Sequence, residues 1–191
     1  MKDEVEKKLI EICLKVARQK KGCLFVIKEG ELNYEHLIKK DFEEFSIFEH
    51  QRRTELLAVV SDGAMIVDLN GNVIDYAVKI SNTKVFPGFG TRHSAAYSAS
   101  LTGNTSVLAS EEDAKVRIFK EGKLIMQIDS AEKNVEQKTS EAVNILESLG
   151  GGTLGTLATT ALVPSMGLQI IPGIIVFGSI YYLIKRFGNG K

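Results

Sequence analysis

An uncharged stretch near the C-terminus is the feature that most constrains what this chain can fold into. From Ser148 to Ile184 the sequence contains no Asp, Glu, Lys or Arg, and Ile170 to Ile184 would be apolar all round a helix. A membrane-spanning helix needs about 20 apolar residues, so one crossing fits easily. We therefore predict a separate folded domain over residues 1–147 and an apolar, membrane-type segment over 148–191, with the membrane reached through 148–187.

The number of membrane crossings stays open. Lys185 and Arg186 follow the apolar stretch, and the positive-inside rule keeps such residues in the cytoplasm. If residues 1–147 also face the cytoplasm, both ends lie on one side of the cell membrane, which favours a hairpin over a single pass. The alternatives are a buried oligomerisation helix, or a glycine-rich linker followed by a core helix. In either case the protein would be cytoplasmic.

Charge and cysteine content restrict the partners of the first 147 residues. All 24 acidic residues lie at or before Glu147, so this part of the chain is mildly acidic. Without a basic stripe it is a poor candidate for a nucleic-acid binder, and we expect no nucleic-acid partner. Cys13 and Cys23 are too few for a disulfide scaffold and are expected to be reduced thiols.

Hydrophobic periodicity predicts alternating helices and strands before the uncharged stretch. Helices are expected over 3–19, 32–48, 53–59, 92–100 and 131–149, and strands over 23–27, 61–69, 73–80, 106–109, 115–120 and 123–128. Asn70–Gly71 between two apolar runs predicts a β-hairpin. Helices around several short strands predict the α/β class, with a mixed β-sheet flanked by helices.

Two clusters combine glycine with polar residues, and each lies where a helix or strand is predicted to begin. Asp62-Gly63-Ala64 opens a strand, where glycine lets the backbone approach a ligand closely; an ordinary turn aspartate is the alternative. Gly90-Thr91-Arg92-His93 opens a helix, whose N-terminus and guanidinium suit a phosphate. The alternative there is Thr91 as a helix N-cap, with Arg92 and His93 solvated.

A third cluster, Ser110-Glu111-Glu112-Asp113, follows the strand predicted to end at Ala109. Carboxylates at a strand exit can hold Mg²⁺ or Mn²⁺ through oxygen ligands, or can form a solvated turn. Together, the three clusters are the components of metal-assisted phosphoryl or nucleotidyl transfer. The sequence contains no Walker A, kinase-loop or dinucleotide-binding glycine motif.

In order and spacing these clusters resemble the diadenylate cyclase (DAC) domain family, over roughly residues 21–128. The family's Asp-Gly-Ala motif is found at Asp62–Ala64, its Gly-Thr-Arg-His motif at Gly90–His93, and its Ser-Glu-Glu element at Ser110–Glu112. The chain departs from the family pattern at Ser94, where a second arginine is common.

The resemblance implies a nucleotidyltransferase that condenses two ATP into cyclic di-AMP and releases pyrophosphate. It also implies a face-to-face homodimer or higher homo-oligomer, and a divalent metal, Mn²⁺ or Mg²⁺. By the resemblance, Asp62, Arg92 and His93 are catalytic, and Asp62 and Glu112 bind the metal. The ATP-binding residues implied are Gly63, Ala64, Gly90, Thr91, Arg92, His93, Ser110 and Glu111.

Two alternatives to an active enzyme follow from the same residues. The chain could be a catalytically inactive, membrane-associated adenine-nucleotide sensor on the same fold, with Ser94 marking the lost chemistry. It could also be a scaffold protein whose apolar tail drives oligomerisation.

Overall fold

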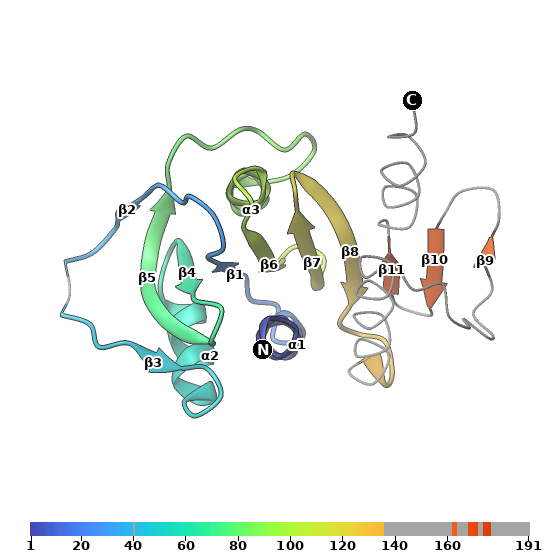
Figure 1. The fold of residues 1–191 in the computed structure, drawn as a ribbon. Helices are drawn as coiled ribbons and strands as arrows, with labels where there is room; N and C mark the ends of the chain where they lie inside the picture. The colour runs from blue at the N-terminus through green and yellow to red at the C-terminus, as the bar shows by residue number, and fades with distance from the viewer. Residues whose placement is uncertain (40, 136–161, 164–167, 172–173, 177–191) are drawn as a thin grey trace.

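The protein is a mixed β-sheet with helices on both faces (Figure 1). The computed structural model describes residues 1–39, 41–135, 162–163, 168–171 and 174–176. Three helices are present in the described residues: α1 (Lys2–Arg18), α2 (Gln51–Val60) and α3 (Thr91–Leu101). The main strands are β1 (Cys23–Ile27), β4 (Ala64–Val67), β5 (Asn72–Ile80), β6 (Thr105–Ala109), β7 (Lys115–Lys120) and β8 (Lys123–Asp129).

The strand order explains why the sheet is mixed. The order is β2-β5-β4-β1-β6-β7-β8-β11-β10-β9, so β1 lies in the interior of the sheet. It pairs with β4 in parallel and with β6 in antiparallel orientation. Every residue of β1, β4 and β6 is buried, as expected for strands that are covered on both faces. The predicted fold class is therefore confirmed for the α/β sheet and its flanking helices.

Two apolar cores lie on opposite faces of the sheet. On one face α1 packs through residues such as Leu9 against Phe25 and Val107. This core also holds the free thiols of Cys13 and Cys23, whose Sγ atoms are 3.7 Å apart. On the other face α3 packs through Ala96 and Ala99 against strand residues that include Leu108 and Phe119. Small residues on α3 let the helix lie close to the sheet.

The predicted helices at 3–19, 53–59 and 92–100 and the hairpin around Asn70–Gly71 are confirmed. The predicted helix over 32–48 is wrong. This segment instead contributes β2 (Tyr34–His36) and β3 (Phe45–Ser46), which both pair with β5. Leu37 and Ile38, which a helix would have buried, are 44% and 46% exposed. The segment lies along the edge of the sheet, where pairing with β5 satisfies its backbone groups.

The predicted apolar tail lies mostly outside the described residues, as do the boundary at 147–148 and the predicted helix beyond Val135. Within the described part, β9 (Leu162–Val163), β10 (Leu168–Ile171) and β11 (Ile174–Val176) are strands, and β11 pairs with the edge strand β8. The expected helix from Ile170 is therefore not found at those positions. Among the residues that the structure describes, no helix has the length and apolar character needed to span a membrane.

Candidate functional site

The first wall of the candidate site is the turn that connects α2 to β4. Gly63 has φ +87°, and a Cβ there would lie 2.4 Å from the carbonyl oxygen of Val78, so only glycine fits without strain. The carboxylate of Asp62 accepts a hydrogen bond of 2.8 Å from the Gly63 N–H. This bond fixes the side chain of Asp62 at the exposed mouth of β4.

The second wall is the N-terminus of α3. Gly90 is the N-cap residue and no side chain caps the helix, so the alternative with Thr91 as N-cap is wrong. Thr91 is instead the first residue of the helix. The free N–H groups of this first turn, together with the positive end of the helix dipole, form a favourable site for an anion.

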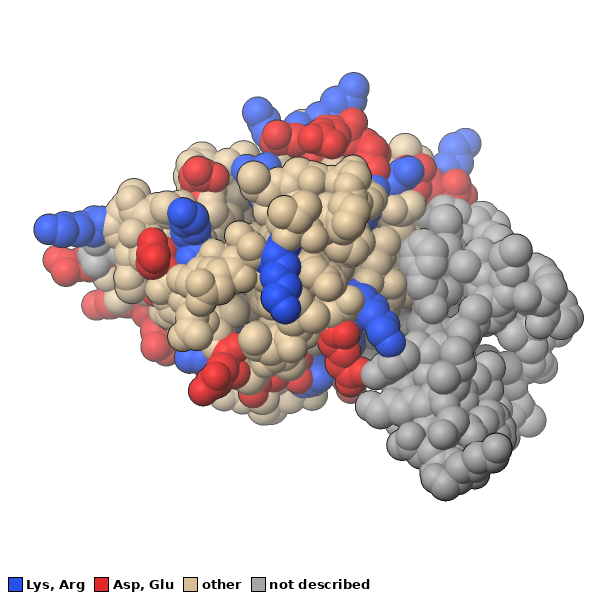
Figure 2. Space-filling view, turned by 90° about the horizontal axis from the view of Figure 1, so that it is seen from above, with Lys and Arg blue, Asp and Glu red and all other residues tan. Residues whose placement is uncertain are grey.

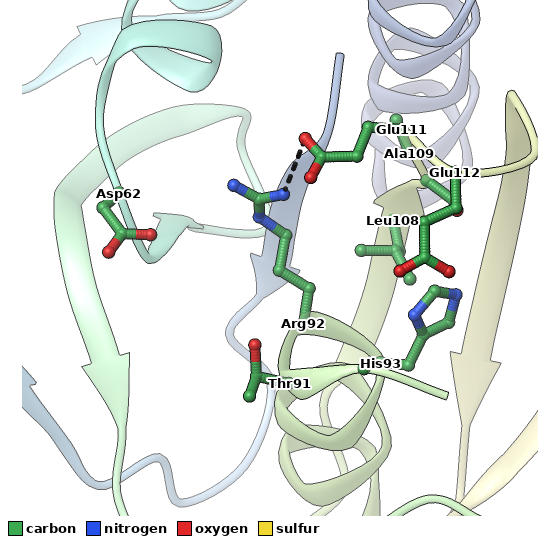
Figure 3. A pocket seen from close by; sticks show the side chains of 10 residues that line it. Asp62, Thr91, Arg92, His93, Leu108, Ala109, Glu111 and Glu112 are labelled. Carbon is green, nitrogen blue, oxygen red and sulfur yellow. Dashed lines mark hydrogen bonds and ion pairs between the residues drawn. The ribbon is translucent and has the colours of Figure 1, made fainter. Parts of the chain in front are cut away.

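The third wall is the turn between β6 and β7. Ser110 is buried, whereas Glu111 and Glu112 are exposed. Nη1 of Arg92 lies 3.4 Å from Oε2 of Glu111, so an ion pair joins the second wall to the third. Figure 3 shows the Arg92 side chain reaching between Asp62 on one side and Glu111 on the other.

The three walls enclose one hollow of about 290 Å³. Its lining comprises Asp62, Gly90, Thr91, Arg92, His93, Leu108, Ala109, Ser110, Glu111 and Glu112. A second hollow of about 240 Å³ shares Asp62, Thr91 and Arg92 with the first. Its remaining lining is made by Gly63 and Ala64, by the apolar side chains of Leu24, Leu37, Val78, Ile80 and Ala95, and by the polar residues Lys79 and Thr83. Every residue that the sequence predicted for the site therefore lines one of two adjoining hollows. One hollow is polar and the other is largely apolar.

Positive charge at the site is local. On the face seen in Figure 2, acidic and basic side chains of the described residues are interspersed rather than gathered into a stripe of one sign. Attraction for an anion in the polar hollow therefore comes from Arg92 and the start of α3, at short range.

His93 differs from the solvated cation that the sequence allowed. Its ring is 5% exposed, and Nε2 lies 3.1 Å from Nη1 of Arg117. Burial, followed by the positive charge of Arg117, lowers the pKa of His93 to about 4. His93 is therefore neutral at pH 7 and can offer the hollow a hydrogen bond but not a charge.

Sequence reasoning missed two residues of the site, Gly22 and Arg117. Gly22 leaves the space that the guanidinium of Arg92 occupies. Arg117 is buried in β7 and makes two hydrogen bonds to Asp113, one of 3.1 Å from Nη1 and a shorter one from Nη2. Burial alone would raise the pKa of Asp113, but the hydrogen bonds from Arg117 and Ser110 and the nearby positive charges lower it to about 2. The available signal was the position of Arg117 two residues before Phe119, on the inward face of an apolar strand.

The carboxylates that line the hollow suit a hard divalent cation. Mg²⁺ is usually bound through one or two carboxylates and substrate phosphates, and Asp62 and Glu112 supply two carboxylates to the same hollow. Within the described ranges there is no group of three or more His, Cys, Asp or Glu side chains placed to hold a metal by themselves. The donor set therefore fits a cation that is shared with a phosphate ligand.

Fold and site together define a mixed α/β domain with a polar hollow at the start of α3 and a largely apolar hollow beside it. The chain belongs to the DAC family, described as the DisA bacterial checkpoint controller nucleotide-binding domain, whose sequence model matches residues 11–124. No curated protein matches the chain.

One solved structure shares the fold, and a second has a lower TM-score. A hypothetical membrane spanning protein from Bacillus cereus has 22% sequence identity and a TM-score of 0.51, over 63% of this chain and 62% of that one. This chain thus spans less than two thirds of that neighbour's length. DacA from Staphylococcus aureus, solved as a double cysteine mutant, has 19% identity and a TM-score of 0.47, over 72% of this chain and 94% of that one.

Proposed function

We propose that the protein is a diadenylate cyclase that condenses two ATP into cyclic di-AMP. The observation that carries this proposal is the convergence of three distant segments on one hollow: Asp62, Gly90–His93 and Ser110–Glu112. Membership of a nucleotide-binding family gives the ligand class. The two hollows together have the size of a site for a single small ligand, which fits one nucleotide per chain.

The two hollows suggest how ATP lies in the site. The apolar hollow lined by Leu24, Val78 and Ile80 suits the adenine ring, whereas the polar hollow at the start of α3 suits the triphosphate. Arg92, now paired with Glu111, would exchange that exposed carboxylate for phosphate oxygens, which accept two parallel N–H bonds. The exchange needs only a side-chain rotation, because both partners are at least one-third exposed.

In the proposed reaction, the 3′-oxygen of one nucleotide forms a bond to the α-phosphorus of the other. The bond from the α-phosphorus to the bridging oxygen breaks, and pyrophosphate leaves. The same step with the two nucleotides in exchanged roles closes the ring, so two phosphodiester bonds form and two pyrophosphates are released for each cyclic di-AMP. Asp62 would take the hydroxyl proton or orient that hydroxyl, and Arg92 would neutralise charge on the phosphates. A bound Mg²⁺ or Mn²⁺, held by Asp62 and Glu112, would supply further charge neutralisation. Because each chain binds one nucleotide, two chains must face each other, so a homodimer or higher homo-oligomer is part of the proposal.

The test is incubation of the full chain with ATP and Mn²⁺ or Mg²⁺, followed by mass detection of products. Asp62→Asn keeps an acceptor for the Gly63 N–H, so it should fold normally and lower the rate of cyclic di-AMP formation by at least about a hundred-fold. Asp3→Asn, an exposed aspartate on α1, is the matched control and should keep full activity. Undiminished turnover by Asp62→Asn would remove this mechanism.

A nucleotide sensor without turnover is the second candidate, and one observation favours it. Ser94 stands where an arginine could have faced the phosphates, and its hydroxyl is instead bonded to the backbone of Phe86 and Gly90. A sensor predicts binding of ATP or cyclic di-AMP with no product under either metal. The same incubation, paired with calorimetric titration of both nucleotides, separates the two candidates.

Attachment to the cell membrane through 148–187, with residues 1–147 in the cytoplasm, is a separate proposal that rests on the uncharged sequence. The full chain should then partition with membranes and need detergent for extraction. A full chain that stays in solution without detergent would favour the cytoplasmic alternative, in which the tail is a packing element.

A further inference from the structure

Arg117 is a buried cation behind the polar hollow that the proposed reaction does not use. It is 3% exposed in the middle of β7, and its guanidinium contacts groups on α3 and β8 and in the segments that precede α3 and β7. Nη1 lies 3.1 Å from Nε2 of His93 on α3, and Nε donates a 2.9 Å bond to Oε1 of Gln127 on β8. Cζ of Arg117 lies 5.0 Å from the centroid of the Phe89 ring.

The contact with His93 fixes where the imidazole carries its proton. A guanidinium has donors only and stays charged at all accessible pH values. Nε2 of His93 must therefore accept the bond from Arg117, so in the neutral ring the proton sits on Nδ1. The low pKa of this ring agrees with that assignment, because the neutral form is the one with a free acceptor nitrogen.

The same guanidinium also binds Asp113, which belongs to the turn between β6 and β7 on the opposite wall of the hollow. Two of its N–H groups donate to the two carboxylate oxygens of Asp113, in the fork geometry that fixes a carboxylate most firmly. Asp113 directly follows Glu112 in the turn between β6 and β7. One buried side chain thus joins the first turn of α3 to the turn that carries Ser110, Glu111 and Glu112.

We propose that Arg117 is a positioning residue of the nucleotide site: it holds His93 as an Nδ1–H donor and fixes the Ser110–Glu112 turn at a set distance from the start of α3. The inference rests on the proposed function only for the identity of the ligand. Arg117 acts through His93 and Asp113 rather than by touching the nucleotide.

The first measurement is the long-range ¹H–¹⁵N spectrum of the imidazole rings in the full chain, with the His93 signals assigned from His93→Gln. The unmodified chain should show His93 with its proton on Nδ1 alone. Arg117→Met should abolish this single-tautomer signature, because no donor then faces Nε2. Gln127→Met removes a different bond from the same guanidinium and is the matched control, with the signature unchanged. A proton on Nε2 in the unmodified chain would overturn the proposal, whether or not any variant folds.

The second measurement is ATP affinity by calorimetry on the same proteins. Arg117→Met should bind ATP about ten-fold more weakly, and Gln127→Met should match the unmodified chain. The loss should be smaller in a His93→Gln background, because part of the effect passes through that ring. Equal losses in both backgrounds would contradict a role through His93.

The two measurements separate this inference from the proposed function. If the unmodified chain binds no ATP but shows the Nδ1–H ring, the proposed function fails and the assignment of His93 by Arg117 stands. If the chain cyclises ATP with the proton of His93 on Nε2, the positioning role fails and the proposed function stands.

Discussion

At the scale of single residues, Gly22 shows how one hydrogen atom in place of a side chain shapes the site. Its backbone angles lie outside the region that only glycine favours, yet a Cβ there would lie 2.4 Å from Nη1 of Arg92 and 3.3 Å from Oε2 of Glu111. Glycine is therefore needed here for the space that Arg92 occupies, rather than for its conformational freedom. Because Arg92 ends in a flexible chain, a methyl group would displace the guanidinium without disturbing the fold.

We therefore expect Gly22→Ala to fold with unchanged thermal stability and to bind ATP roughly three- to ten-fold more weakly. Gln19→Ala, an exposed neutral position in the same turn, is the matched control. Calorimetric titration with ATP and a thermal unfolding curve on each variant check this. Equal affinities of the Gly22 and Gln19 variants would show that ATP binding does not need the space at Gly22 that Arg92 now occupies.

The buried ring of His93 makes the stability of the protein depend on pH. In the unfolded chain this group takes up a proton near pH 6.5, whereas in the folded chain it does so only near pH 4. As the pH falls from 6.5 to 4, the unfolded state binds more protons and the free energy of unfolding decreases. The loss attributable to His93 should be on the order of 1–3 kcal/mol.

Urea unfolding of the full chain at several pH values between 4 and 7.5 measures this loss. His93→Gln keeps an acceptor for Arg117 but has no proton to gain, so its stability should fall less steeply over the same range. Parallel curves for the two proteins would mean that the histidine titrates alike in the folded and unfolded states.

At the scale of elements, the segment that leads into α3 is tied to the helix by two serines. The hydroxyl of Ser94 accepts a 3.1 Å bond from the Phe86 N–H, and that of Ser98 accepts a 2.7 Å bond from the Lys84 N–H. Phe86 in turn stacks on Phe89, which lies against His93. The serines thus hold the aromatic residues that cover Arg117 and the neutral ring of His93.

Ser94→Ala should raise the rate of amide hydrogen exchange at Phe86 and lower the free energy of unfolding by about 1 kcal/mol. Ser100→Ala is the matched control on the same helix. Its hydroxyl accepts a bond from the Gly122 N–H, so faster exchange should be confined to that turn. Unchanged protection of the Phe86 amide in Ser94→Ala would show that the loop is held by its aromatic contacts alone.

Elements with a strong local period could be predicted from the sequence, and those that depend on distant partners could not. The helical period of apolar residues predicted α1, and the Asn70–Gly71 turn predicted the hairpin of β4 and β5. Residues 32–48 have no such period. Their strands form by pairing with β5, a distant partner that the local sequence does not indicate. In the site, the resemblance of the three motifs to the DAC family predicted which segments converge. The contact of His93 with Arg117 joins residues 24 positions apart, and no local pattern links the two.

At the scale of the whole molecule, the proposed reaction needs two chains, so the rate should depend on their concentration. One chain supplies a single Asp62 and a single start of α3 to the two adjoining hollows. At high dilution, where dimers dissociate, the rate per chain should fall by at least about ten-fold as the concentration drops well below the dissociation constant. Initial rates over a dilution series, compared with sedimentation at the same concentrations, check this. A rate that stays proportional to concentration while the protein sediments as a monomer would contradict the two-chain reaction.

The rim of the polar hollow has a further consequence. Asp62, Thr91 and Glu111 are exposed, so a ligand seated among them keeps one edge open to the surroundings. With the proposed reaction, the rate of cyclic di-AMP formation would then depend on how often two chains meet as well as on the groups within each chain. Concentrating the chains on a small area would raise the rate, and dispersing them would lower it, without any change in the fold.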